Sequence, residues 1–127
     1  MAWDTALARD QDYDAAMQLT RDARVERMFL KEARAQELFK EAAERLLPHA
    51  RCEDYGAVTQ LSTYMTVVDI AQRSGQLKLA KEAAQEAVKL FTATYPDESR
   101  LSFDMKVWLE TLRLTLFKIN HQSGADS

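Results

Sequence analysis

The sequence has few of the residues that break regular structure or cross-link a chain. Among its 127 residues there are three glycines, two prolines and one cysteine. A single cysteine forms no internal disulfide, which argues against a disulfide-stabilised secreted domain. Few glycines and prolines leave few turns, which favours long helices. These residues mark the expected ends of helices, at Pro48, Gly56, Gly75, Pro96 and Gly124.

Long apolar runs and an excess of positive charge are also missing. No stretch approaches the ~18 consecutive apolar residues of a membrane span. Residues 1–14 carry four aspartates and no apolar run, unlike a signal peptide. The formal net charge is −3, and no basic stripe is present to neutralise phosphates. We therefore expect a cytoplasmic protein that binds neither nucleic acid nor a membrane.

The remaining composition is that of a globular protein. Hydrophobic residues make up 46% of the chain and charged residues 29%, both ordinary values for a folded domain. A chain of this length buries a core without disulfides or metal. Strand-like runs of alternating β-branched residues are absent. We predict one all-helical domain over residues 1–121 and a polar C-terminal tail over residues 122–127.

Apolar residues recur every three or four positions along most of the chain, which is the spacing of one buried helix face. The pattern predicts helices over about 2–10, 14–24, 25–47, 55–73, 76–93 and 97–120. A turn is expected at Asp12–Asp14 and a break near Asp22–Glu26. Because no Gly or Pro separates Tyr13 from Leu47, a single bent helix there is the alternative. The expected fold is five to six antiparallel helices, as a stack of helical hairpins or as a bundle.

The last predicted helix has two apolar sides. One side carries a regular stripe of Leu101, Met105, Trp108, Leu109, Leu112, Leu116 and Ile119. The second side carries Phe103, Val107, Leu114 and Phe117. A second apolar side covers more of the core, forms a dimer contact or receives a partner's helix. The sequence leaves these three uses open.

One segment carries a family resemblance. Residues 75–90, with small residues at Ala80, Ala84 and Ala87, resemble the second helix of a tetratricopeptide repeat, and Tyr64 to Ala71 lie where its first helix would be. Two weaker fragments, residues 12–23 and 35–48, resemble parts of the same motif. Ala16, Ala35 and Ala80 are 19 and 45 residues apart, whereas that repeat has a period of about 34 residues. A plain helical bundle without repeats is the alternative.

The resemblance implies a non-enzymatic module that binds a peptide or helix of another protein, as an adaptor or a small chaperone-type subunit does. In that family the first helix of each hairpin lines the concave surface. Here those positions are Ser62, Met65, Asp69, Gln72 and Arg73, and Arg73 is suited to hold a carboxylate. A homodimer formed through the last helix is the second hypothesis. A cofactor-binding or enzymatic bundle is the third.

Residues capable of metal or nucleophilic chemistry are few. His49, Cys52, Glu53 and Asp54 are the only such cluster in the sequence, and a structural zinc site needs four ligands of the Cys and His type. We interpret this cluster as a polar loop between helices. The sequence contains no glycine-rich phosphate loop and suggests no Ser–His–Asp set. We therefore predict no catalytic residue, no metal site and no cofactor.

Overall fold

A computed structural model describes residues 3–126 of the chain. These residues form five α-helices, two short 3₁₀ turns and no strand, which confirms the predicted all-α fold. The helices are α1 (Ala6–Met28), α2 (Glu32–Ala50), α3 (Ala57–Arg73), α4 (Leu77–Thr94) and α5 (Phe103–Asp126). The 3₁₀ turns are η1 (Glu53–Tyr55) and η2 (Glu98–Arg100).

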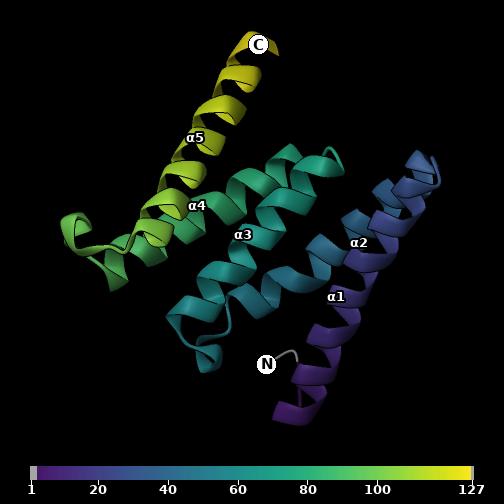
Figure 1. Ribbon diagram of the computed structural model, residues 1–127, viewed down its shortest axis with the longest axis horizontal. Coiled ribbons are helices and arrows are strands. Elements are labelled where there is room, and N and C mark those ends of the chain that lie inside the picture. Colours follow the sequence, from purple (N-terminus) through teal and green to yellow (C-terminus); the bar gives the residue numbers. More distant parts are fainter. Residues whose placement is uncertain (1–2, 127) are drawn as a thin grey trace.

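The helices are stacked in sequence order (Figure 1). The main contacts join α1 with α2, α2 with α3, α3 with α4 and α4 with α5, and each helix runs antiparallel to the one before it. The first and last helices therefore lie at opposite ends of the stack. Since α5 packs mainly on α4, a large part of its surface has no neighbouring helix.

Two helical hairpins, α1–α2 and α3–α4, are closed by the same three-residue turn. In the first turn, the amides of Leu30 and Lys31 donate to the carbonyls of Arg27 and Glu26, over 3.0 Å each. In the second, the amides of Gly75 and Gln76 donate to the carbonyls of Gln72 and Ala71, over 3.1 and 2.8 Å. Both pairs of bonds form the Schellman motif, which satisfies the last carbonyls of a helix.

The structure repeats with a spacing of 45 residues. The two left-handed turn residues, Leu30 and Gly75, are 45 residues apart, and so are the 3₁₀ turns η1 and η2. Fully buried alanines follow the same spacing: Ala35 with Ala80, and Ala42 with Ala87. The chain thus contains two hairpins and the first helix of a third unit. This spacing exceeds the ~34 residues of a tetratricopeptide repeat, and membership of that family stays a prediction.

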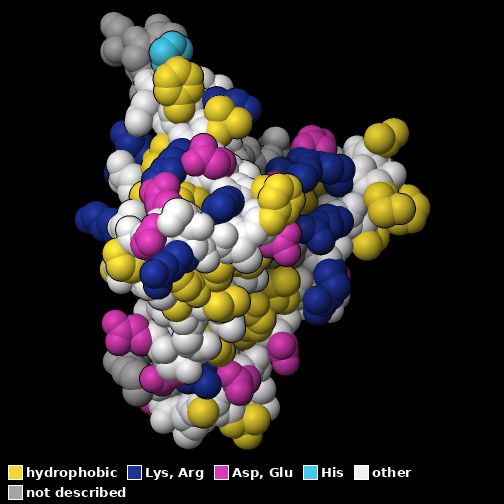
Figure 2. Space-filling model, turned by 60° about the vertical axis from the view of Figure 1, so that its left-hand side comes forward, with side chains coloured by type: hydrophobic (Ala, Val, Ile, Leu, Met, Phe, Trp, Pro, Cys, Tyr) yellow, Lys and Arg dark blue, Asp and Glu magenta, His cyan; other side chains and the backbone are white. Residues whose placement is uncertain are grey.

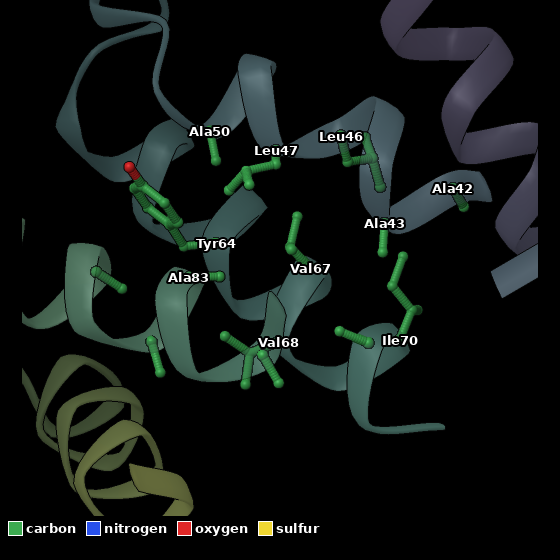
Figure 3. Packing of buried hydrophobic residues seen from close by; sticks show 14 of the residues in the cluster. Ala42, Ala43, Leu46, Leu47, Ala50, Tyr64, Val67, Val68, Ile70 and Ala83 are labelled. Atoms are coloured by element: carbon green, nitrogen blue, oxygen red, sulfur yellow. The ribbon is translucent and has the colours of Figure 1, made fainter. Parts of the chain in front are cut away.

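The core lies between consecutive helices and is rich in alanine. On α4, Ala80, Ala83, Ala84 and Ala87 are fully buried, which lets the neighbouring helices approach closely. Figure 3 shows Val67 of α3 directed toward Leu47 of α2, and Val68 directed the other way. One helix thereby packs against two neighbours through adjacent residues. Larger side chains fill the gaps, with Phe39 and Phe91 almost completely buried.

The helix boundaries in the first half differ from the prediction. Neither the turn at Asp12–Asp14 nor the break near Asp22–Glu26 exists, because α1 runs unbroken through both. A single helix over residues 14–47 is also wrong, since the chain turns at Phe29–Lys31. Leu30 adopts φ 61° there, a conformation that usually marks glycine. Because Leu30 stands where Gly would be expected, no local signal marks the turn.

Two further boundaries shift. We expected a connection from Pro48 onward, but α2 continues to Ala50 because His49 and Ala50 are both buried. We expected the last helix to begin near Asp97, but α5 begins at Phe103, where the hydroxyl of Ser102 caps the amide of Met105 at 3.3 Å. Its helical backbone continues to Asp126, through most of the predicted tail; Ser127 lies outside the described residues.

Candidate functional site

The five residues predicted to line a concave surface lie on one side of α3. Ser62, Gln72 and Arg73 are exposed, and Met65 and Asp69 are partly buried. The guanidinium of Arg73 donates from Nε to both oxygens of Asp69, at 3.1 and 3.2 Å. Arg73 would have to give up this pair to hold a partner's carboxylate. This side of α3 is therefore largely polar, and two of its charged groups are already paired with each other.

The four residues predicted on the second side of α5 are solvent-exposed. The exposed fractions are 80% for Phe103, 46% for Val107, 53% for Leu114 and 60% for Phe117. The opposite side of the helix packs into the core, with Leu109, Leu112, Thr115 and Ile119 buried. At 3.6 residues per turn the four exposed residues form a single line along the helix. We call this line the α5 stripe.

A shallow hollow lies in the middle of the α5 stripe. Its volume is about 320 Å³, and its lining residues are Lys106, Val107, Glu110, Thr111 and Leu114. The carboxylate of Glu110 is held by Arg113 at 3.0 Å, and Arg113 also pairs with Glu98 of η2. The hydrogen bond from Arg113 lowers the pKa of the Glu98 carboxyl. Glu110 itself lies within the apolar line, between Val107 and Leu114, and its partner Arg113 lies beside the line.

The two predicted surfaces occupy equivalent positions in the 45-residue repeat. Ser62, Asp69 and Gln72 of α3 correspond to Val107, Leu114 and Phe117 of α5. At these three positions the face is polar on α3 and apolar on α5, whereas Met65 of α3 corresponds to the charged Glu110 of α5. Figure 2, which brings this end of the molecule forward, shows hydrophobic side chains interspersed with charged ones.

Comparison of the chain with protein-family models, with curated proteins and with solved structures gave no match. The candidate site therefore depends on the geometry of this structure alone. Over the described residues, no helix is both long enough and apolar enough to cross a membrane.

A second group of exposed apolar residues lies at the tip of the first hairpin. Val25, Met28, Phe29 and Leu30 are 49–91% exposed. The sequence predicts a helix over residues 25–47 that would include all four, but α1 ends at Met28 and the chain turns before α2 begins at Glu32. This patch lies at the end of a helix and on the following turn, whereas the α5 stripe extends along a helix.

Sequence reasoning missed a buried polar cluster at the base of the first hairpin. His49 is fully buried in α2, so its assignment to a polar loop was wrong. Its Nε2 lies 2.7 Å from a carboxylate oxygen of Asp12, and its Nδ1 lies 3.0 Å from the hydroxyl of Tyr55. Trp3 stacks on the imidazole with ring centres 4.2 Å apart. In neutral His49 the Nε2–H donates to Asp12 and Tyr55 donates to Nδ1.

Asp12 is the centre of this cluster. Its carboxylate also accepts hydrogen bonds from Arg45 at 2.8 Å and from the indole N–H of Trp3 at 3.2 Å. Burial acts to raise the pKa of Asp12, but the hydrogen bonds from Arg45, His49 and Trp3 outweigh it and hold that pKa below its usual value. Since the partners come from α1, α2, η1 and the segment before α1, the cluster fastens these elements together.

A cavity of about 500 Å³ adjoins this cluster and is lined by Trp3, Asp4, Thr5, Ala6, Arg9, Pro48, Arg51, Cys52, Glu53 and Asp54. Both of its arginines are already paired. Arg9 contacts Asp54 at 3.2 Å, and Arg51 contacts Glu82 and Glu86 at 2.7–2.8 Å. An anionic ligand would have to displace these carboxylates. Both ring nitrogens of His49 are also occupied, so His49 has no free lone pair to activate Cys52.

Metal-binding geometry is not found in the described part of the chain, where no three His, Cys, Asp or Glu side chains gather around a common point. The hydrogen bonds around Asp12 hold parts of the fold together. In the cavity beside this cluster both lining arginines are already paired with carboxylates. Among the described residues, the α5 stripe places four large exposed apolar side chains along one face of a helix. It is therefore the candidate functional site.

Proposed function

We propose that this chain is a non-enzymatic protein-interaction module and that its binding surface is the α5 stripe. One observation carries the proposal: four large apolar side chains lie exposed in a line on the side of α5 opposite its core contacts. Such a line matches the apolar face of an amphipathic helix from another protein. Burial of each side chain contributes roughly 1–2 kcal/mol, so four together support measurable affinity.

Comparison with α3 supports this proposal. The face of α3 that is equivalent to the stripe stays accessible to solvent although α3 has a neighbouring helix on each side, and it carries Ser62, Asp69 and Gln72. On α5 the same positions carry large apolar side chains, so a partner helix would bind across the open face of the stack. The family resemblance noted in residues 75–90 points in the same direction, because tetratricopeptide repeats are protein-binding scaffolds.

The polar side of α3 is the second candidate surface. It includes Ser62, Asp69 and Arg73, with the Asp69–Arg73 pair exposed to solvent. An extended peptide with its own acidic and basic groups would form ion pairs with Arg73 and Asp69 in place of the pair that they form with each other. Replacing one exposed ion pair by another contributes little to binding affinity, which is why the α5 stripe is preferred.

The test is site-specific photo-crosslinking in cells that produce the protein. A benzophenone amino acid replaces Phe117 in the stripe or, as the control, Asn120, which is exposed on another side of α5. We expect a discrete crosslinked species from position 117, its absence from position 120, and its loss when Leu114→Asp is added. Circular dichroism checks that each variant is folded. Identical crosslinking from both positions, or a species that survives Leu114→Asp, would contradict the proposal.

A further inference from the structure

We propose that the partner of the α5 stripe is a second copy of this chain, with the two α5 helices packed antiparallel about a twofold axis near Glu110 and Thr111. This inference rests on the proposed function, because it uses the same surface. It adds the identity of the partner and the direction in which the two helices pair.

The order of apolar residues along the stripe supports an antiparallel pair. The steps from Phe103 to Val107, Leu114 and Phe117 are four, seven and three residues. Read from the other end they are three, seven and four, so the line nearly superposes on itself when reversed. In an antiparallel pair Phe103 lies beside Phe117 of the second copy, and Val107 lies beside Leu114 of the second copy. A twofold interface requires this self-complementarity.

The charges at the two ends of the stripe are complementary in the same arrangement. Asp104 directly follows Phe103, and Lys118 directly follows Phe117; both are exposed. Within one chain they are separated by roughly 21 Å along the helix, at 1.5 Å per residue, so they do not meet. Antiparallel pairing brings Asp104 of each copy to Lys118 of the other. The symmetry produces this pair twice.

The middle of the stripe is shaped to receive side chains. The hollow of about 320 Å³ is lined by Val107 and Leu114, the two residues that an antiparallel pair brings together around the axis. The Glu110 side chains of the two copies would lie near each other at the axis, and each is held by Arg113 at 3.0 Å, which offsets part of their repulsion. One pair of helices buries less area than the ~1,200–2,000 Å² of most stable complexes. We therefore expect a weak, concentration-dependent dimer.

The experiment is sedimentation velocity of the full chain over about 1 to 500 µM, the range in which a small interface is populated. For the wild type we expect the mass to rise from 14.5 kDa toward twice that value. Leu114→Asp should weaken the dimer about a hundredfold, since the charge lies at the centre of the contact. Asn120→Asp, on another side of α5, is the matched control and should leave the dimer unchanged. Circular dichroism confirms the helix content of each variant.

A charge swap tests the direction of pairing. Asp104→Lys and Lys118→Asp should each weaken the dimer about two- to tenfold, because the exposed pair occurs twice. The double variant with both changes should recover the wild-type dissociation constant. In a parallel pair Asp104 would lie beside Asp104 of the second copy and Lys118 beside Lys118, so neither single change would weaken the dimer. On an unrelated partner the double variant would not recover. A dimer that the single changes do not weaken, or that the double variant does not restore, overturns the antiparallel arrangement.

The outcomes separate this inference from the proposed function. A wild type that stays monomeric over the whole range overturns self-association, whereas crosslinking from position 117 to a different protein would leave the proposed function standing. A dimer that persists in Leu114→Asp overturns the use of the stripe for self-association. A dimer that is lost in Leu114→Asp, weakened by each single charge change and recovered in the double charge variant supports both the inference and the proposed function.

Discussion

Leu30 and Gly75 occupy the same position in two helical hairpins and share a left-handed backbone conformation, with φ values of 61° and 75°. Each is the residue after the C-cap of a helix, and each donates its amide to the carbonyl three positions earlier. Glycine adopts this conformation without strain, whereas a leucine has a Cβ that crowds the backbone. The first hairpin therefore carries a cost that the second avoids.

Exchanging the residue types at these two turns should change stability in opposite directions. Leu30→Gly should raise the free energy of unfolding by about 0.5–1 kcal/mol, because the strain is removed and Leu30 is 91% exposed. Gly75→Ala should lower it by about 1 kcal/mol; a Cβ at Gly75 would meet no neighbouring atom, so backbone strain alone acts. Urea denaturation measures both. A destabilised Leu30→Gly would show that the leucine side chain contributes a contact.

The buried alanines should set the distance between helices. Ala80 is fully buried, so Ala80→Leu should lower the free energy of unfolding by about 1–3 kcal/mol through overpacking. Ala93, near the end of the same helix, is exposed, and Ala93→Leu should change it by less than about 0.5 kcal/mol. Thermal unfolding followed by circular dichroism compares the two. Equal effects would mean that α4 does not pack closely at Ala80.

The network around Asp12 should make stability fall in acid. The folded-state pKa of Asp12 lies below its usual value of 3.8, so its ionised form stabilises the fold above that value, and the contribution is lost as the pH falls through the folded-state pKa. At pH 7, Asp12→Asn should cost about 1–3 kcal/mol, because it weakens the bonds to Arg45 and buried His49. Its loss of stability between neutral pH and pH 2 should be smaller than in the wild type.

The matched control for this effect is Asp14→Asn, which changes an exposed carboxylate on the same helix. It should follow the wild-type profile of stability against pH. Urea denaturation at a series of pH values gives the profiles. If Asp12→Asn and the wild type lose the same stability in acid, Asp12 does not carry the acid dependence.

The pKa of Tyr64 should be higher than that of an ordinary tyrosine. Burial, together with the neighbouring carboxylate of Glu86, raises the pKa of Tyr64 to about 12, and its hydroxyl donates to Glu86 at 3.2 Å. Glu86→Gln removes the negative charge and should bring this pKa down toward 10, the usual value. NMR of ¹³Cζ-labelled tyrosine measures the four tyrosines separately, and Tyr64→Phe assigns the signal. An unchanged titration in Glu86→Gln would mean that burial alone raises the pKa.

Helical periodicity predicted more of this fold than turn signals did. The hairpin turn at Gly75 was located because glycine marks it, and α4 was predicted within a residue or two of Leu77–Thr94. The turn at Leu30 was missed because a leucine adopts the conformation that glycine usually supplies. The aspartates at positions 12 and 14 predict a turn, because aspartate is common in turns. Asp12 instead lies inside α1, where its carboxylate accepts hydrogen bonds from His49 and Arg45 of α2.

The functional-site residues likewise include some that the sequence reveals and some that it does not. The second apolar side of α5 was visible in the sequence, because Phe103, Val107, Leu114 and Phe117 share one helix face. The fully buried His49 was not, since nothing in its local sequence shows that Trp3, Asp12 and Tyr55 meet around it. Such contacts join residues up to 46 positions apart in the chain, and local periodicity carries no information about them.

The sequence by itself determined that the chain is helical and which side of each helix is apolar, because both depend on neighbours three and four residues away. Only the tertiary structure decided where the first hairpin turns, that the units repeat every 45 residues, and that the α5 stripe stays uncovered. Those features depend on which helix packs beside which. That choice is made by the fit of whole helix faces, as at Ala80 and Phe91, which are both buried on α4.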